Sequence, residues 1–423
     1  MSGALPSDDH LGPWLAREWQ FVLATFSGSG VGYLGSSAAP VIVQALIDAG
    51  LSHQRAGDLG TIELMTLALT SMLATGVVTR VSHRGLAFGG VLLAGLGVAL
   101  SALSAEYAPM ILGRVLLGVG SGAAIAGANA AIAARADAER VFAVIWTLGG
   151  GVTAALTIQL PTVVAGGNYP AGFAVLGALC LVAAPFLLWI PPRPAHLDRD
   201  ISVVSAVAGG EALPTAGVMG ASGDRRSGLL GPLSLLVLAG MFTYSVAEQA
   251  LWQFSYDIAV DHGIPYDQVR YLLGVTTLAG LVGGAIAARV GLRRGRVTPL
   301  LIGSLLSLLG RWGYLVATTP TSLALSSLAW GIGFYFVSPY QIGLAAALDR
   351  RGRIAVAATG VMNLGYGLGP TLGGRLRQYQ LDQGLDTGVL VVAIAGATLI
   401  SLALLLPAAL RLERSGLVQR QHT

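Results

Sequence analysis

Residues 387–409 read TGVLVVAIAGATLISLALLLPAA, a run of 23 residues without a charged side chain. A helix needs about 20 consecutive apolar residues to cross the hydrocarbon core of a bilayer. Further predominantly apolar runs occur at about 20–46, 58–79, 86–104, 107–132, 141–165, 171–190, 229–256, 269–288, 297–317, 321–347 and 354–376. The sequence therefore predicts an all-α membrane protein with twelve transmembrane helices.

The composition of the chain excludes several other classes of protein. It has 423 residues, of which 54% are hydrophobic and 11% charged, whereas soluble domains carry about 25% charged residues. All 25 Lys and Arg residues are Arg, so the P-loop motif, which needs a Lys, is absent. We therefore do not expect this chain to hydrolyse ATP. Cys180 is the single cysteine and the six His lie in predicted connectors or tails. We therefore expect no cofactor, no metal site, no catalytic residues and no enzyme activity.

The distribution of the arginines predicts the topology. With the N-terminus in the cytoplasm, 19 of the 25 Arg lie on the inner side of the predicted spans and 4 on the outer side. Cytoplasmic loops of membrane proteins carry this excess of basic residues. The sequence thus predicts an integral protein of a bacterial inner membrane with both termini in the cytoplasm. The basic charge is explained by topology, so we expect the lipid bilayer and not nucleic acid as a partner.

The predicted spans divide into two groups of six. The segment between them contains Pro191, Pro192 and Pro194 together with several charged residues, as a solvated linker would. The expected organisation is an N-terminal tail (1–19), a six-helix bundle (20–190), a linker (191–228), a second six-helix bundle (229–410) and a C-terminal tail (411–423).

Three motifs resemble those of a known family. Residues 365–374 (GYGLGPTLGG), 114–120 (RVLLGVG) and 284–294 (GAIAARVGLRR) are similar to the G-x-x-x-G-P-x-x-G-G, R-x-x-x-G-x-G and G-x-x-x-D-R-x-G-R-R motifs of the major facilitator superfamily. The first lies on the eleventh predicted helix, whereas the family's antiporters carry it on the fifth, and Ala288 replaces the Asp of the third. Residues 30–35 also match G-x-G-x-x-G, but no strand precedes them, so a dinucleotide site is not expected.

The resemblance covers almost the whole chain. It implies two pseudo-symmetric six-helix bundles around a central cavity, with the first, fourth, seventh and tenth helices surrounding that cavity. It also implies transport by alternating access and no chemical conversion of the solute.

Four charged residues lie well inside the predicted spans, away from their ends: Glu63, Arg114, Glu248 and Arg311. Such groups are costly in hydrocarbon and are functional candidates by default. Counted along the helices, all four lie roughly 9–12 Å from the outer end. Two interpretations remain open: Glu63, Glu248 and Arg114 couple transport to protons, or Glu63–Arg114 and Glu248–Arg311 are structural ion pairs. The resemblance places the ninth helix outside the cavity and so favours a structural role for Arg311.

Polar and aromatic side chains recur at helical spacing beside these charges. Tyr244, Glu248 and Trp252, for example, are each four residues apart and share one face of a helix. A cavity lined by such groups suits a small organic solute, although ordinary helix packing would give the same stripes. The predicted substrate-binding residues are Arg114, Trp146, Tyr244, Glu248, Trp252, Tyr335, Tyr340, Gln341 and Asn363.

The function expected from these features is secondary active transport of a small organic solute, coupled to protons. Burial favours the protonated form of a carboxyl group and a nearby Arg favours the ionised form, so movement of a Glu relative to an Arg would load and release a proton. An organic acid or zwitterion suits a site with charges of both signs. The alternatives are an efflux antiporter for amphipathic cations, with Glu63 or Glu248 as counter-charge, and a receptor or scaffold without flux. We expect the protein to be a monomer.

Overall fold

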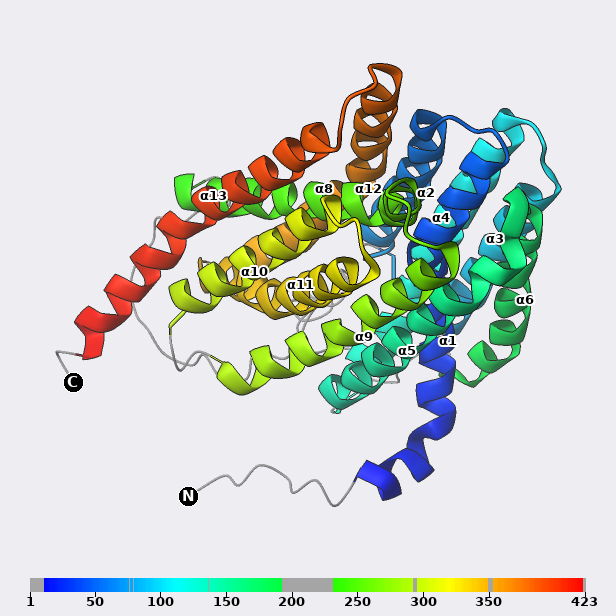
Figure 1. Ribbon diagram of the computed structural model, residues 1–423. Coiled ribbons are helices and arrows are strands. Elements are labelled where there is room, and N and C mark those ends of the chain that lie inside the picture. The colour runs from blue at the N-terminus through cyan, green and yellow to red at the C-terminus, as the bar shows by residue number, and fades with distance from the viewer. Residues whose placement is uncertain are drawn as a thin grey trace.

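The computed structural model describes residues 11–191, 231–348 and 353–420, apart from 76, 79, 136 and 292–294. This part of the chain contains twelve α-helices and no strand, as predicted (Figure 1). The first half contains α1 (Leu11–Asp48), α2 (His53–Thr75), α3 (His83–Leu103), α4 (Tyr107–Ala133), α5 (Ala138–Val164) and α6 (Tyr169–Phe186). The second half contains α8 (Pro232–Asp261), α9 (Tyr266–Val290), α10 (Val297–Leu315), α11 (Pro320–Leu348), α12 (Arg353–Asp382) and α13 (Gly388–Arg420). Two short 3₁₀ segments, η2 (Ala165–Gly167) and η3 (Leu187–Trp189), flank α6.

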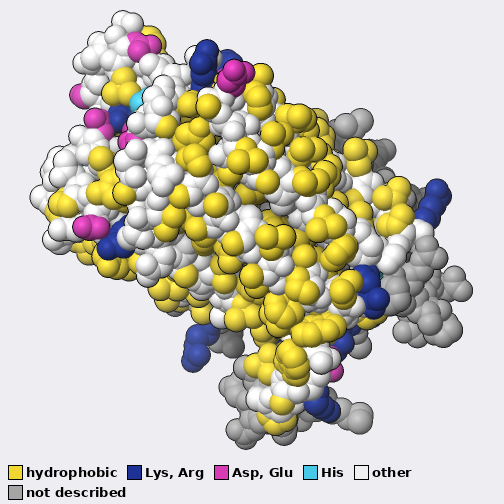
Figure 2. Space-filling view, turned by 90° about the vertical axis from the view of Figure 1, so that its right-hand side faces the viewer, with side chains coloured by type: hydrophobic (Ala, Val, Ile, Leu, Met, Phe, Trp, Pro, Cys, Tyr) yellow, Lys and Arg dark blue, Asp and Glu magenta, His cyan; other side chains and the backbone are white. Residues whose placement is uncertain are grey.

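The outer surface of the bundle is apolar. Nine of the described helices are long and apolar enough to cross a membrane by length and composition alone. The other three, α2, α10 and α12, are less apolar. Large side chains such as Leu181 and Val392 are exposed on this surface. Figure 2 shows hydrophobic side chains over the centre of one face and charged side chains toward its margins. An apolar surface of this extent is typical of lipid contact.

The ends of some helices differ from the predicted boundaries. Helix α1 begins at Leu11, within the predicted N-terminal tail, and its start is held by a hydrogen bond of 2.9 Å from Trp14 Nε1 to Asp137. Hydrogen bonds from Arg135 and then from Trp14 lower the pKa of Asp137 to about 2. At the other terminus, α13 continues to Arg420, within the predicted C-terminal tail. The predicted linker, apart from Pro191, and residues 1–10 lie outside the described part.

Helix α12 contacts both halves of the molecule because it lacks side chains at the crossing points (Figure 1). A methyl group on Gly369 would lie 2.8 Å from Gln249 Cβ and 2.9 Å from the amide nitrogen of Ala250, both on α8. On the opposite side of α12, a methyl group on Gly57 of α2 would lie 2.3 Å from the carbonyl oxygen of Pro370. Small residues allow membrane helices to approach this closely. The motif at 365–374 is therefore a helix-packing motif in this fold.

The G-x-G-x-x-G match in α1 also serves close packing. Gly35 lies in the middle of this helix, and a methyl group on it would lie 1.6 Å from Oε1 of Glu63 on α2. Gly32 is in similar contact with the side chain of Ile125 on α4. These contacts agree with the expectation that the segment is not a nucleotide site.

We predict that Gly369→Ala destabilises the protein. An alanine in a helix is normally favoured over glycine by about 1 kcal/mol, but overpacking against α8 should cost about 1–3 kcal/mol. The Tm of the purified protein in detergent, followed by intrinsic fluorescence, should therefore fall. Gly396→Ala on α13 is the matched control because a methyl group there contacts nothing within 4 Å. Equal Tm values for the two variants would contradict the proposed close contact.

Candidate functional site

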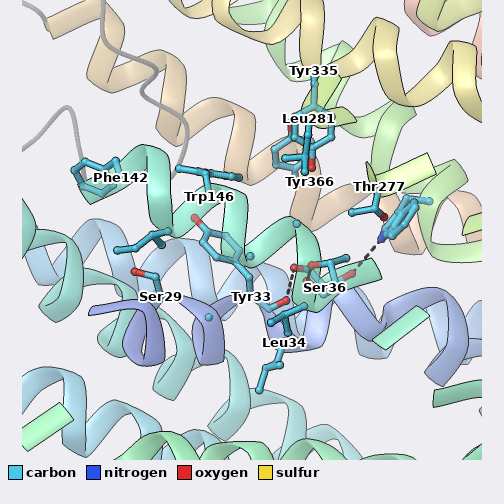
Figure 3. A pocket seen from close by; sticks show the side chains of 18 of the residues that line it. Ser29, Tyr33, Leu34, Ser36, Phe142, Trp146, Thr277, Leu281, Tyr335 and Tyr366 are labelled. Carbon is cyan, nitrogen blue, oxygen red and sulfur yellow. Dashed lines mark hydrogen bonds between the residues drawn. The ribbon is translucent and has the colours of Figure 1, made fainter. Parts of the chain in front are cut away.

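A cavity of about 710 Å³ lies between the two halves of the chain. Helices α1, α2, α4 and α5 form its wall on one side and α8, α9, α11 and α12 on the other. Tyr33 and Trp146 face the cavity from the first half, and Tyr335, Tyr366 and Leu281 from the second half (Figure 3). Aromatic side chains with a few polar groups among them are typical of sites for small organic molecules.

The cavity opens toward one end of the bundle. Its lining extends from the middle of the helices to Arg135 and Ala138, where α4 ends and α5 begins. The opposite ends of the same helices, near His53 at the start of α2, contribute no described lining residue. We call these two the Arg135 end and the His53 end.

Hydrogen bonds between the two halves close the cavity toward the His53 end. Trp252 Nε1 on α8 donates to the carbonyl oxygen of Ser36 on α1 at 3.0 Å. One level further out, Thr371 Oγ1 on α12 donates to Asp58 on α2 at 2.7 Å, and the amide of Thr371 donates to Thr61 Oγ1 at 2.9 Å. Each of these bonds joins a helix of one half to a helix of the other.

The outermost closing contact is a charged cluster. His53 Nε2 on α2 lies 3.1 Å from Asp257 Oδ1 on α8, and the other oxygen of this carboxylate accepts a 2.8 Å bond from Arg377 Nε on α12. Arg377 also binds Asp261 at 2.9 Å and is 1% exposed. The apolar run that predicted this span stops at residue 376, but α12 continues to Asp382 and so includes Arg377. His53 is the member of this cluster that comes from the first half.

Glu248 lies in the wall of the cavity with both carboxylate oxygens occupied. It pairs with Arg311 of α10, and Trp330 Nε1 of α11 lies 2.9 and 3.1 Å from its two oxygens. Arg311 is fully buried behind Glu248, donates to Thr398 at 3.0 Å and lies over the ring of Tyr244. A buried ion is tolerated only when it is paired and hydrogen-bonded in this way.

Glu63 and Arg114 form a second buried ion pair, with 2.5 Å between Oε2 and Nη1. The guanidinium also lies 4.7 Å from the ring centroid of Phe173 on α6. Neither Glu63 nor Arg114 lines the cavity. Both ion pairs that the sequence analysis left open are thus formed, and only the pair of Glu248 reaches the cavity.

The structure brings some of the predicted binding residues together and separates others. Trp146, Glu248, Trp252, Tyr335 and Asn363 line the cavity, whereas Arg114, Tyr244, Tyr340 and Gln341 do not. Tyr244 instead donates to Ser307 at 3.0 Å, and Tyr340 donates to the carbonyl oxygen of Gly291 at 3.0 Å. Tyr335 and Tyr340 are five residues apart and so point about 140° apart around the helix. One of the two must therefore face away from a cavity that the other lines.

Sequence reasoning missed Gln249. It lines the cavity, is 8% exposed, and its Nε2 has no hydrogen-bond partner among the described residues. Gln249 lies one residue from Glu248 and so about 100° around the helix from the stripe that includes Tyr244 and Trp252. The sequence did contain a signal for Gln249, because it is a hydrogen-bonding side chain directly after Glu248 in a predicted span.

Comparison with known proteins gives a consistent result. The model of the Major Facilitator Superfamily matches residues 24–374, well over half of the chain. The nucleoside transporter NupG has a TM-score of 0.72 at 11% sequence identity, covering 92% of this chain and 99% of NupG. A bacterial homologue of the human lysosomal transporter Spinster, in an inward-facing and unoccupied conformation, has a TM-score of 0.63 at 16% identity and covers 96% of both chains. A peptide transporter of the POT family has a TM-score of 0.64 at 13% identity, covering 92% of this chain and 96% of that one.

At these identities the solved structures share the fold alone. No curated protein matches the chain in sequence.

We predict that the cavity is reached from the Arg135 end. In a Cys180→Ala background, the cavity-lining variant Ser29→Cys should react with a membrane-impermeant maleimide several-fold faster from that side of the membrane. Glu106→Cys, in the exposed connector between α3 and α4 near the His53 end, should react from the opposite side. Labelling of everted and right-side-out vesicles measures both rates. Faster reaction of Ser29→Cys from the side that labels Glu106→Cys would contradict the assignment.

Proposed function

The chain belongs to the major facilitator superfamily, and on that premise we propose that it is a secondary active transporter for a small organic solute. The observation that carries the proposal is a cavity between the two halves that opens at one end and is closed at the other by bonds between those halves. Such a site supports alternating access, in which the solute is exposed to one side of the membrane at a time. The cavity also favours a transporter over the alternative of a scaffold, because a scaffold needs no site for a solute.

The closing bonds supply the means of alternation. Opening the His53 end would separate Trp252 from Ser36, Thr371 from Asp58, and Asp257 from His53. Each hydrogen bond contributes a net of only about 0.5–1.5 kcal/mol. Solute binding and new contacts at the Arg135 end would have to supply the few kcal/mol that these bonds contribute together. With both termini in the cytoplasm, as the arginine distribution favours, this conformation would face inward.

Glu248 is our candidate for coupling to protons. Of the described lining residues, it is the one acidic side chain, and its partner Arg311 lies on a different helix. A shift of α8 relative to α10 would leave an unpaired carboxylate in a medium of low dielectric constant, and proton uptake would relieve that cost. Glu63 and Arg114, which we also predicted to take part, lie away from the cavity. We now propose that this second pair is structural.

The described lining offers no free charge to a charged solute. An organic acid or zwitterion was expected because charges of both signs were predicted in the cavity, but the guanidinium of Arg114 is engaged with Glu63 outside it. The alternative of cation efflux needs an uncompensated carboxylate, and Glu248 is compensated by Arg311. Neither charged class is supported by a free counter-charge in the described lining.

We predict that proton coupling depends on Glu248. Proteoliposomes with an imposed pH gradient should accumulate a tritiated solute through the wild-type protein. The first probes are uridine, because NupG is a nucleoside transporter, and indole-3-acetate, because an organic acid was the first expectation. Glu248→Gln should lose gradient-driven accumulation at least tenfold while keeping exchange without a gradient, since Gln resembles the protonated Glu.

Glu63→Gln is the matched control because it alters the other buried Glu–Arg pair without touching the cavity. This variant should accumulate as much solute per folded protein as the wild type when the pH gradient is imposed. Full accumulation by Glu248→Gln would remove Glu248 from the coupling mechanism. Binding of a probe without any accumulation by the wild-type protein would favour the receptor alternative.

We predict that weakening the bonds between α2 and the second half makes the cavity accessible from the His53 end. The double variant His53→Ala/Thr371→Val removes two of the bonds between α2 and the second half. It should raise the labelling rate of Ser29→Cys from the His53 side several-fold, because the closed end is weakened. Thr243→Val on α8 is a suitable control, since the Thr243 hydroxyl bonds only within its own helix in the described contacts. No change in labelling would mean that these bonds do not hold the end closed.

A further inference from the structure

We propose that the cavity selects uncharged, planar aromatic solutes that offer a hydrogen-bond acceptor to Gln249. The inference rests on the proposed function in one respect, that the cavity is the substrate site. It goes further by naming the class of substrate and the residue that recognises it. Three independent features of the described lining carry it: its charge balance, its aromatic walls and the unsatisfied amide donor of Gln249.

The first feature is charge balance. Glu248 and Arg135 are the two formally charged residues of the described lining. Glu248 is paired with Arg311. Arg135, at the mouth, is paired with Asp137 at 2.7 Å and with Glu18 at 3.0 Å.

An anion or a cation that enters the cavity would lose part of its hydration. It would gain no new ion pair in return, because both charged residues of the described lining already have partners. Burial of a charge without a partner is strongly unfavourable. The cavity should therefore discriminate against charged solutes of either sign.

The second feature is the arrangement of aromatic rings. Tyr33 and Trp146 pair at a centroid distance of 6.1 Å on the first half. On the second half, Phe334 and Tyr335 pair at 5.0 Å, and Tyr366 also lines this side of the cavity (Figure 3). Two aromatic walls that face each other offer ring faces and edges to a flat solute. The cavity volume of about 710 Å³ accommodates a molecule of drug size.

The third feature is the amide of Gln249. Most hydroxyl donors of the lining are already used within their own half: Thr276 donates to the carbonyl oxygen of Leu272 at 2.8 Å, and Ser36 to that of Tyr33 at 3.0 Å. Gln249 Nε2 is buried without a partner among the described residues. A buried donor left unsatisfied is costly, and a bound acceptor removes that cost. A carbonyl, hydroxyl or ring nitrogen on the solute would serve.

The test uses ring systems that each exist in neutral, anionic and cationic forms. Indole-3-acetamide, indole-3-acetate and tryptamine form one series, and nicotinamide, nicotinate and 3-(aminomethyl)pyridine form another. Binding to the purified full-length protein is measured by isothermal titration calorimetry at pH 7. In at least one series the neutral member should bind at least tenfold more tightly than both charged members.

Gln249→Leu should weaken binding of that neutral member about tenfold. Gln341→Leu is the matched control, because Gln341 is also buried with unpartnered amide atoms but does not line the cavity. Its affinity for the neutral probe should equal that of the wild type. Tightest binding by a charged member in both series, absence of binding by both neutral members, or unchanged affinity in Gln249→Leu would each overturn the inference.

The two proposals fail in different ways. Binding of neutral probes with the predicted Gln249 dependence, but without accumulation in proteoliposomes, contradicts transport and leaves the selectivity intact. Accumulation of a charged probe, together with failure of the neutral ones to bind, contradicts the selectivity and leaves transport intact.

Discussion

The close crossing of α2 and α12 determines how the two halves of this protein meet. At Gly57 the backbone of α2 touches the carbonyl oxygen of Pro370, and no larger residue could occupy that position without moving a helix. The contact brings Thr371 within bonding distance of Asp58 and Thr61. Because the halves are joined at this level, the cavity below it opens toward the Arg135 end in this conformation. The sidedness of the site thus follows from a backbone contact.

Buried charge is handled in the same way at three places. Glu63, Glu248 and Asp257 each bind an arginine from a neighbouring helix, and each arginine is almost completely buried. Pairing reduces the cost of carrying ions in an apolar medium. The three pairs differ in what surrounds them: one is packed away from the cavity, one forms part of its wall, and one bridges the halves through His53. Similar ion pairs therefore lie in three different surroundings in a single chain, and we propose separate roles for them.

The sequence predicted the helices well because a bilayer imposes a minimum length on every span, and apolar runs report that length directly. It predicted helix ends less well, since α12 continues through Arg377 where the apolar run stops. Spacing identified residues that share a helix face but not the direction of that face. Trp252 and Tyr244 belong to one stripe, yet Trp252 lines the cavity and Tyr244 packs behind it. Gln249 escaped notice because it lies outside the stripe of Tyr244 and Trp252, about 100° around the helix from Glu248.

The proline of α12 has a mechanical consequence. Pro370 cannot donate the backbone hydrogen bond that would otherwise reach the carbonyl oxygen of Tyr366, one turn earlier. A helix lacking that bond flexes at this level more easily than elsewhere. Tyr366 lines the cavity, and Pro370 itself touches the opposite half. A bend at this level of α12 would therefore move both the contact with α2 and the wall of the cavity.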